Sequence, residues 1–462
     1  MRFKNITLWL IMCSFATVSV AQTSVVAHAD MPFPIERTII RDYNFPATVS
    51  FVECTSESYF VYADASLSPI YMPIDPNCYV NDFVIDNDTV WFCGKNIKGL
   101  GIIGFFDIND FFFGLNNYNI INGSLSTSNS KVTNLTKLVS YKDSLNARHV
   151  VAIGKTDLGQ YCVVNITPKT GNPYCLYETG EVPANSPETM VAIQTSDYNV
   201  FTGGMYLLDT ANPALALRAY DKRFVLTAAS NIHNYANEVV DVTSQYSFCL
   251  DQVALIQLTC MEIGVAAFYK SRQNGTITTF PEGTYIGRYR IEEPKDFFSH
   301  LYSIIVPHPF HAGGWRMQEF SKEYIPNSTF NLLQKYEMPN SGSLQSVIYE
   351  LSMNIVDNAS PFQYVTTSDY IFHSIDGHYA TPYYLMNGYS VNTQSALVYN
   401  MGEQGNNNCL EIKNIYPDPI DMTTIAHYAP LSLKTGKVVF DVFNSPSLTE
   451  IITIDCSAKS NR

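Results

Sequence analysis

Short apolar runs, separated by polar or glycine-containing turns, recur along most of the chain. The stretch from Val90 to Ile108, VWFCGKNIKGLGIIGFFDI, holds two such runs around a turn rich in Lys and Gly. The same order of apolar strand, turn and second strand begins again at six later positions: Arg148, Tyr198, Val253, Leu301, Asp369 and Thr423. With successive units roughly 45 to 70 residues apart, the chain carries about seven copies of one structural unit.

These runs are continuously apolar instead of alternating between apolar and polar residues. A strand reads this way when both of its faces are buried. In a β-propeller, each blade is a four-stranded sheet with a neighbour on both sides, and blades of about 40 to 50 residues plus longer loops fit the spacing. The pattern therefore predicts an all-β protein, a β-propeller of about seven blades. Tandem β-sandwich domains are the alternative, because they also give many short strands.

The first residues have the pattern of a secretory signal peptide. Arg2 and Lys4 precede an apolar stretch, residues 6–20, and Ser19-Val20-Ala21 supplies the small residues that a signal peptidase reads. We expect residues 1–21 to be removed, although Ala27-His28-Ala29 offers a second cleavage site. The expected location is the periplasm or the cell surface. No later segment has the about 18 consecutive apolar residues of a transmembrane helix.

The rest of the chain contains no low-complexity linker that would mark a domain boundary. We expect residues 22–44 to form a lead-in segment and residues 45–462 to form a single β-propeller domain. A strand from the lead-in would close the ring by pairing with the C-terminal segment, which removes a free sheet edge.

The chain is acidic, with 28 Lys and Arg residues against 42 Asp and Glu residues and a net charge of −14. Phosphate binding needs clustered Lys and Arg, so nucleic acids and anionic membrane surfaces are disfavoured as partners. The 31 Tyr and 27 Phe residues support the strand interpretation, because aromatic side chains fit a pleated surface.

The chain has ten cysteines, of which Cys13 lies within the expected signal peptide. Cys162 and Cys175 flank a turn signal at residues 169–172, so a hairpin there sets them near each other and makes them the candidate disulfide. The alternative is a pair of buried thiols, which behave as small apolar residues. The sequence leaves the pairing of the other cysteines open.

Candidate ligand-binding residues are few. His308 and His311 lie close before Trp315, an arrangement that fits a metal or sugar-stacking site, but Pro309 favours a simple loop. The pair Tyr383-Tyr384 is a second aromatic candidate. The acidic stretches at residues 86–89 and 107–110 are interpreted as turns. Motifs for a catalytic nucleophile, a nucleotide-binding loop or a metalloprotease are absent, so we identify no catalytic residue, metal site or cofactor.

With a signal that ends in Ala-Gln and repeated hairpins, the chain resembles secreted β-propeller-like proteins of the kind exported by Gram-negative gut anaerobes. The resemblance rests on no family-specific motif, so it implies no functional residue. We expect a non-catalytic binding module for a protein partner or a glycan, with the following candidate residues: Trp315, His308, His311, Tyr383 and Tyr384. The alternative is a carbohydrate-active hydrolase or lyase, with carboxylates that converge at the mouth of the central channel. The oligomeric state is left open.

Overall fold

The fold was analysed in a computed structural model. It describes the backbone of residues 24–30, 35–43, 47–64, 67–113, 118–121, 130–142, 148–166, 173–178, 191–195, 199–209, 212–221, 236–240, 246–257, 262–271, 283–291, 298–307, 316–322, 329–337, 344–352, 362–365, 370–377, 383–390, 395–402, 407–411, 438–439, 443–445 and 448–455. Side chains are described for part of these ranges, between Arg37 and Leu301.

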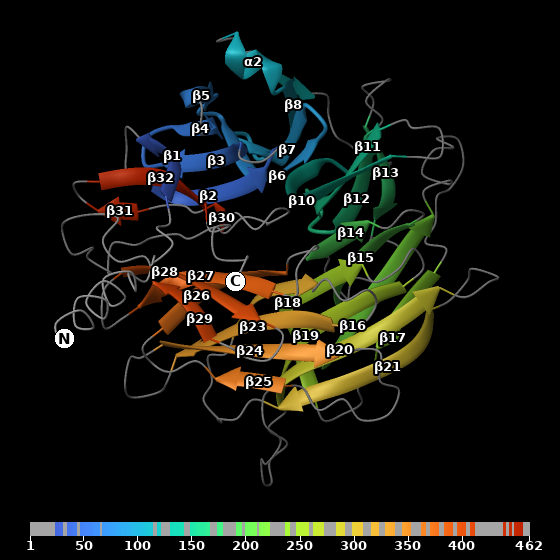
Figure 1. Cartoon of the computed structure of the whole chain (residues 1–462). Helices are drawn as coiled ribbons and strands as arrows, with labels where there is room; N and C mark the ends of the chain where they lie inside the picture. Colours follow the sequence, from blue (N-terminus) through green and yellow to red (C-terminus); the bar gives the residue numbers. More distant parts are fainter. Residues whose placement is uncertain are drawn as a thin grey trace, which may run out of the picture.

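The described strands form eight four-stranded antiparallel sheets (Figure 1). The first sheet contains β2 (Ile35–Asp42), β3 (Thr48–Cys54), β4 (Ser58–Asp64) and β5 (Leu67–Ile74). The second contains β6 (Cys78–Asp86), β7 (Thr89–Asn96), β8 (Gly101–Asp107) and β9 (Asn119–Ile121), and a short helix, α2 (Asn109–Phe112), follows β8. The third contains β10 (Val132–Lys142), β11 (Arg148–Thr156), β12 (Tyr161–Ile166) and β13 (Pro173–Glu178).

The next four sheets repeat this plan of four consecutive strands. The fourth contains β14 (Ala192–Thr195), β15 (Asn199–Asp209), β16 (Asn212–Asp221) and β17 (Ala236–Val240). The fifth contains β18 (Tyr246–Gln257), β19 (Glu262–Ser271), β20 (Gly283–Ile291) and β21 (Phe298–Pro307). The sixth contains β22 (Arg316–Lys322), β23 (Thr329–Glu337), β24 (Leu344–Ser352) and β25 (Phe362–Val365). The seventh contains β26 (Tyr370–Gly377), β27 (Tyr383–Ser390), β28 (Ser395–Gly402) and β29 (Asn407–Glu411).

The eighth sheet joins the two ends of the described chain. Strand β1 (Ser24–Asp30) pairs antiparallel with β32 (Leu448–Asp455), which also pairs with β30 (Val438–Val439) and β31 (Phe443–Ser445). The prediction that an N-terminal strand pairs with the C-terminal segment is confirmed. Strand β2 also lies in the segment expected to be a lead-in, and it pairs with β3, so the first sheet begins before residue 45.

The first strands of successive sheets lie side by side around a common centre (Figure 1). Strand β2 contacts β6, β6 contacts β10, and the series continues through β14, β18, β22 and β26. Each of these sheets therefore packs on the next one in the chain, as blades do, whereas a β-sandwich packs its sheets in isolated pairs. The prediction of an all-β propeller is confirmed. The eight described sheets exceed the predicted number of about seven, which is not confirmed.

Strand β7 explains why the sequence contains continuous apolar runs. Val90 and Phe92 are buried in the core between the first two sheets, whereas Trp91 and Cys93 are buried in the core toward the third sheet. Four consecutive residues are thus buried because the strand has a packed sheet on both of its faces. The first of these cores is aromatic, and the ring centroid of Phe60 lies 5.0 to 5.5 Å from those of its neighbours.

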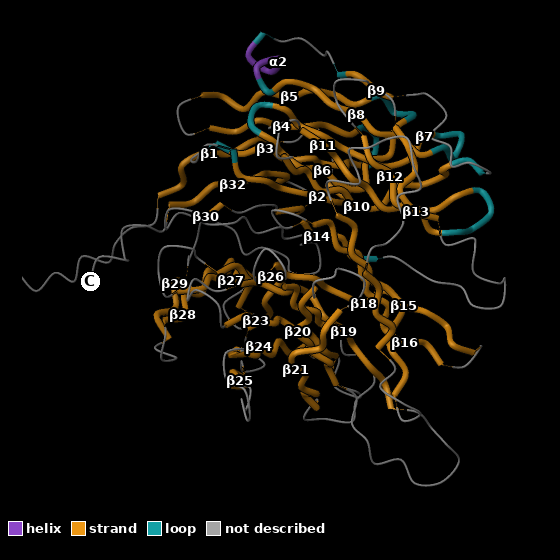
Figure 2. The backbone as a smooth tube through the Cα atoms, turned by 90° about the vertical axis from the view of Figure 1, so that its right-hand side faces the viewer, coloured by secondary structure: helices purple, strands orange, loops and turns teal. Residues whose placement is uncertain are grey.

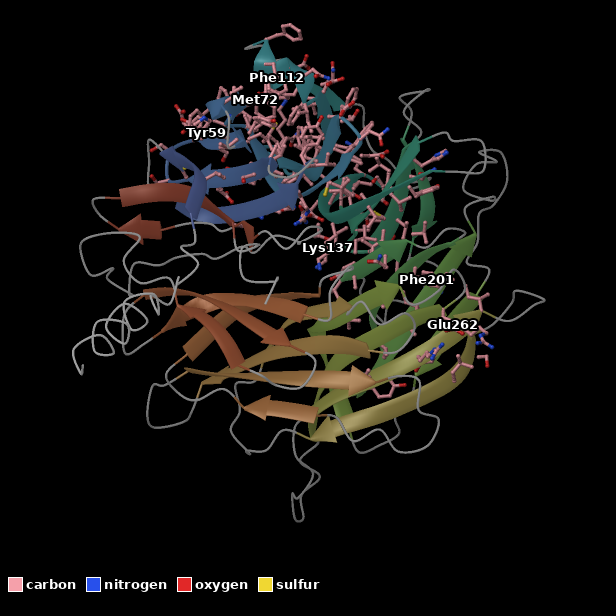
Figure 3. All side chains as sticks on the ribbon, in the orientation of Figure 1. Tyr59, Met72, Phe112, Lys137, Phe201 and Glu262 are labelled. Atoms are coloured by element: carbon pink, nitrogen blue, oxygen red, sulfur yellow. The ribbon has the colours of Figure 1, made fainter. Side chains whose placement is uncertain are left out.

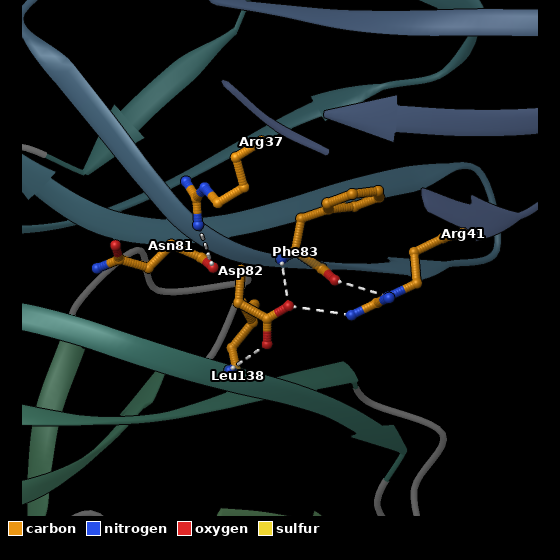
Figure 4. A network of polar contacts seen from close by, with 6 residues as sticks. All are labelled: Arg37, Arg41, Asn81, Asp82, Phe83 and Leu138. Atoms are coloured by element: carbon orange, nitrogen blue, oxygen red, sulfur yellow. Dashed lines mark hydrogen bonds and ion pairs between the residues drawn. The ribbon is translucent and has the colours of Figure 1, made fainter. Parts of the chain in front are cut away.

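A polar network joins the first three sheets near the centre (Figure 4). Asp82 on β6 forms an ion pair with Arg41 on β2, with 3.0 Å between Oδ1 and Nη2. The same oxygen accepts the N–H of Phe83 at 2.9 Å, and Oδ2 accepts the N–H of Leu138 on β10 at 3.2 Å. One carboxylate therefore bonds strands from three successive sheets.

The described part of the chain contains no helix that is long and apolar enough to cross a membrane. Two predicted repeat units are wrong in their internal pairing. The unit that begins at Tyr198 was expected to be a tight hairpin, but it is one continuous strand, β15, whose glycines Gly203 and Gly204 lie inside the strand and form no turn. The unit that begins at Leu301 covers β21 and β22, which belong to two different sheets, so it is a connection between sheets instead of a hairpin.

Candidate functional site

The histidines and the tryptophan singled out by the sequence, His308, His311 and Trp315, lie outside the described residues. Tyr383 and Tyr384 are the first two residues of β27, where the backbone alone is described, and they pair with Gly402 and Met401 of β28. The proposed roles of these five residues therefore stay predictions.

The candidate disulfide lies on the predicted hairpin, but the register differs from the expected one. Cys162 on β12 pairs with Glu178 of β13, and Cys175 pairs with Val164, so the two cysteines are not opposite each other. No disulfide joins the cysteines whose side chains are described, and Cys162 is buried between the second and third sheets. The ladder next to the turn pairs Ile166 with Pro173, which puts Val164 and not Cys162 opposite Cys175, and the register shift between Val163 and Val164 moves the partner of Cys162 one residue farther, to Glu178.

The centre of the ring was the expected place for a ligand. In the described part, the first strands carry mixed polar residues there instead of converging carboxylates: Arg37 and Arg41 on β2, Asn81 and Asp82 on β6, and Asn134 and Lys137 on β10. Both oxygens of Asp82 already accept bonds that hold the sheets together. No group of three or more potential metal ligands occurs among the described residues.

The strongest candidate site lies away from the centre, at α2, which projects at the edge of the second sheet (Figures 1 and 3). Asp107 at the end of β8 shapes the turn that leads into the helix, because its Oδ1 accepts the backbone N–H of Asn109 at 2.8 Å. Phe111 is buried and packs on Phe106, with 5.4 Å between ring centroids. A helix of four residues buries one face, so the next phenylalanines in the sequence face solvent.

Phe112 and Phe113 are 47 % and 74 % exposed. The ring of Phe112 lies edge-on to that of Tyr62, with 5.1 Å between centroids, and Tyr62 lies 6.3 Å from Tyr43. We call these four side chains, Tyr43, Tyr62, Phe112 and Phe113, the aromatic rim. Tyr62 on β4 is buried and Tyr43, which follows β2, is half-buried, so the accessible part of the aromatic rim is formed mainly by Phe112 and Phe113 at α2.

A carboxylate borders the aromatic rim. The hydroxyl of Tyr43 donates to Oδ1 of Asp88 at 2.6 Å. Asp88 lies in the two-residue turn between β6 and β7, whose first residue, Asn87, has a φ of 54°. Asn tolerates this left-handed conformation better than most residues do. The predicted turn at residues 86–89 is confirmed, and it brings an acceptor beside an apolar surface.

This arrangement is suited to binding. Exposed aromatic rings offer flat apolar area, and a nearby hydroxyl and carboxylate fix the orientation of a polar ligand group. The sequence reasoning did not single out these residues. In the sequence, the run Phe111-Phe112-Phe113 could not be distinguished from the buried apolar runs of strands such as β7.

No protein-family model matches the chain, and no curated protein matches it either.

Solved structures match the chain by shape. Sqt1 of Saccharomyces cerevisiae has a TM-score of 0.52 at 10 % identity, over 92 % of this chain and 97 % of that chain. A polysaccharide lyase of family PL25, an ulvan lyase, has a TM-score of 0.48 at 10 % identity, over 85 % and 98 % of the two chains. The β-propeller domain of the Trilobed protease from Pyrococcus furiosus has a TM-score of 0.44 at 8 % identity, over 85 % and 99 %.

The chain also matches a prolyl endopeptidase, but it spans 50 % of that protein's length. At these identities the similarity concerns the fold alone. The matches include both the β-propeller domain of Vanderwaltozyma polyspora Nup133 and enzymes such as the lyase, so they do not assign a function. The fold of this protein is the β-propeller.

Proposed function

We propose that this protein is an exported binding module and that its aromatic rim contacts a protein partner or a glycan. The observation that carries the proposal is the exposure of two adjacent phenylalanines, Phe112 and Phe113, on a short projecting helix. Burial of one such ring in an interface contributes about 1.5 to 3 kcal/mol. Aromatic residues are enriched where proteins bind partners, and they are also the residues on which sugar rings stack.

The proposal is tested with the double variant Phe112→Ser/Phe113→Ser. A glycan array and a chemical cross-linking experiment on the intact protein are run with the wild type and the variant. We expect the variant to lose at least tenfold in apparent affinity for whatever the wild type binds, while its thermal midpoint stays within a few degrees.

The matched control is Leu301→Ser, which removes another exposed apolar side chain, 39 % exposed, on β21. The control should bind as the wild type does. Equal binding by the double variant and the wild type would overturn the role of the aromatic rim.

Catalysis by a carbohydrate-active hydrolase or lyase stays a prediction from the sequence. Incubation of the protein with a panel of neutral and acidic polysaccharides, followed by a reducing-end assay and by absorbance of unsaturated products, tests it. Release of fragments would replace the binding proposal with an enzymatic one.

The export of the protein is part of the proposal. Cleavage after Ala21 leaves the closing strand β1, which begins at Ser24, complete. Cleavage after Ala29 would remove all of that strand except Asp30. We therefore expect intact-mass measurement of protein from the periplasm or cell surface to give a first residue of Gln22. A first residue of Asp30, or recovery of full-length protein from the cytoplasm, would contradict this.

A further inference from the structure

Two turns on neighbouring sheets have the same geometry, at the end of the sheets opposite to α2. In the turn between β7 and β8, the N–H of Asn96 donates to the carbonyl of Leu100 at 2.8 Å, and the N–H of Gly99 donates back to Asn96 at 2.8 Å. Gly99 has a φ of 71°, in the left-handed region that glycine adopts without strain.

The turn between β11 and β12 repeats these bonds. The N–H of Thr156 donates to the carbonyl of Gln160 at 2.8 Å, that of Gly159 donates to Thr156 at 3.0 Å, and Gly159 has a φ of 76°. Both turns connect the second and third strands of their sheets, so they project on the same side of the molecule (Figure 2).

The two turns belong to one continuous surface. A Cβ atom added to Gly101, which follows the first turn, would lie 2.9 Å from Cγ1 of Val132 at the start of β10. The preceding residue, Lys131, accepts the backbone N–H of Asp157 in the second turn at 2.8 Å and donates its own N–H to the Asp157 carboxylate at 3.0 Å. We call this surface, made of Tyr79 and residues 95–101, 131–132 and 155–160, the turn face.

Large apolar side chains project from the turn face. Ile97 is 62 % exposed, Leu158 is 64 % exposed and Tyr79 is 43 % exposed. Neither Ile97 nor Leu158 is needed to shape its turn, because the bonds above are made by backbone groups and glycine. Exposed apolar residues that cluster on one surface, and that the fold does not require, are typical of interaction sites.

The turn face is also basic, in contrast to the chain as a whole. Its charged residues are four exposed lysines and one aspartate: Lys95, Lys98, Lys131, Lys155 and Asp157. Asp75, on the neighbouring loop, uses its carboxylate to accept bonds from Asn77. The Nζ of Lys95 lies 5.8 Å from the ring centroid of Tyr79, so a cation and an exposed ring stand side by side.

We infer that the turn face is a second interaction surface, which takes an acidic polypeptide segment that carries apolar side chains. Its lysines complement carboxylates, and Ile97, Leu158 and Tyr79 complement the apolar residues between them. The net charge of −14 favours a polypeptide over an anionic membrane. Charges interact over a Debye length of about 8 Å at physiological salt. A narrow polypeptide segment is therefore attracted by the lysines of the turn face, whereas a broad anionic bilayer is also repelled by the acidic residues of the rest of the protein.

Fluorescence anisotropy with labelled synthetic peptides tests the inference on the intact protein. The probes are (Asp-Leu-Glu)₄, (Asp-Ser-Glu)₄ without apolar residues, and (Lys-Leu-Lys)₄ with the charge reversed. We expect the first probe to bind at least tenfold more tightly than the other two, and its affinity to fall as salt is added. Failure of the first probe to bind, or equal binding of all three probes, would overturn the inference.

Variants locate the binding. Lys95→Glu/Lys155→Glu and Ile97→Ser/Leu158→Ser should each weaken binding of the first probe at least tenfold. The control is Lys137→Glu, which reverses the charge of one exposed lysine of β10 outside the turn face and should bind as the wild type does. Unchanged binding by both turn-face variants would place the probe elsewhere and overturn the inference.

Two further measurements separate the alternatives. The protein should not co-sediment with vesicles of phosphatidylglycerol. If it does, and if the Lys95→Glu/Lys155→Glu change abolishes co-sedimentation, then the ligand of the turn face is an anionic membrane and not a polypeptide. The Phe112→Ser/Phe113→Ser variant should bind the first probe normally, so this inference and the proposed function fail independently.

Discussion

At the scale of single residues, the most consequential group is the carboxylate of Asp82. It accepts hydrogen bonds from the Arg41 guanidinium and from two backbone N–H groups, and these donors come from three different strands (Figure 4). Without this carboxylate, the packed sheets would leave these donors with neither water nor a protein acceptor. The sequence contained no signal for this role, because 42 acidic residues occur in the chain and the partners of Asp82 are mostly distant in sequence.

Replacement of this carboxylate should destabilise the protein. We expect Asp82→Ala to lower the free energy of unfolding by about 2 kcal/mol, because buried donors are left without acceptors. Urea unfolding at neutral pH measures the loss. Asp110→Ala, on the short helix α2, should change stability by less than about 0.5 kcal/mol. An equal loss in the two variants would contradict the bridging role of Asp82.

A buried cysteine thiol and a buried tyrosine hydroxyl make the stability of the protein decrease at high pH. Burial raises the pKa of the Cys78 thiol to about 11, and Asp75 adds to the effect. Burial, followed by the hydrogen bond to Glu57, raises the pKa of Tyr59 to about 12. Both groups hold their protons more tightly in the folded state than in the unfolded state, so the unfolded state gains stability as the pH rises above the ordinary pKa of each group.

We therefore expect the free energy of unfolding to fall as the pH rises from about 9 toward 11. Urea titrations across this range measure the slope. The Cys78→Ala variant should show a shallower slope than the wild type, because one of the groups that titrate differently in the two states is gone. The same slope in both proteins would remove Cys78 from the explanation.

At the scale of elements, the recurring feature is a first strand with a register shift opposite a glycine on the second strand. In β6 the pairing shifts between Val80 and Asp82, and in β10 it shifts between Leu135 and Lys137. The backbone of the shifted strand then presses on the second strand. A Cβ atom at Gly94 would lie 1.8 Å from the carbonyl oxygen of Tyr79, and one at Gly154 would lie 2.1 Å from that of Asn134.

This geometry predicts unequal costs for two glycines that lie five residues apart. Gly94→Ala should lower the free energy of unfolding by about 3 kcal/mol or more, because the backbone of β6 must move. Gly99→Ala should cost about 1 kcal/mol, since that glycine has a positive φ but open space around it. Thermal and urea unfolding of the two variants measure the difference, and a reversed order would contradict the close contact at Gly94.

Strands with two buried faces were predictable from the sequence, and strands with mixed faces were not. The apolar run in β7 indicated its burial correctly. The first sheet was missed as a repeat unit, because its strands contain polar residues such as Ser50, Glu53 and Ser58 among the apolar ones. The aromatic rim was missed for a different reason. It depends on how a four-residue helix turns three phenylalanines, which no periodicity in so short a segment reveals.

At the scale of the whole molecule, the ring depends on the pairing of an N-terminal strand with a C-terminal strand. The sequence suggested this pairing only because it is a common way to remove a free sheet edge. Strand β1 pairs with β32 and also contacts β4 and β5 of the first sheet. The closing sheet therefore ties the C-terminal strands to the first sheet. The number of sheets was harder to predict, because one is assembled from both ends of the described chain and has no repeat of its own.

Removal of the closing strand should loosen the entire ring. We expect deletion of residues 24–30 to lower the thermal midpoint by several degrees and to promote self-association, because the edge of β32 becomes available to other chains. Calorimetry and size-exclusion chromatography measure both effects. A synthetic peptide of residues 22–32 should restore the midpoint when it is added in excess, and failure of the deletion to change either measurement would contradict the closing role.

The pairing of β1 with β32 also has a consequence for the order of events during synthesis. The strand that leaves the ribosome first must wait for a partner made roughly 400 residues later, and contacts so distant in sequence form slowly. Until the last residues arrive, every nascent copy carries an unsatisfied edge that neighbouring copies can capture. Production of this protein should therefore depend more than usual on chaperones that keep incompletely synthesised chains from associating with one another.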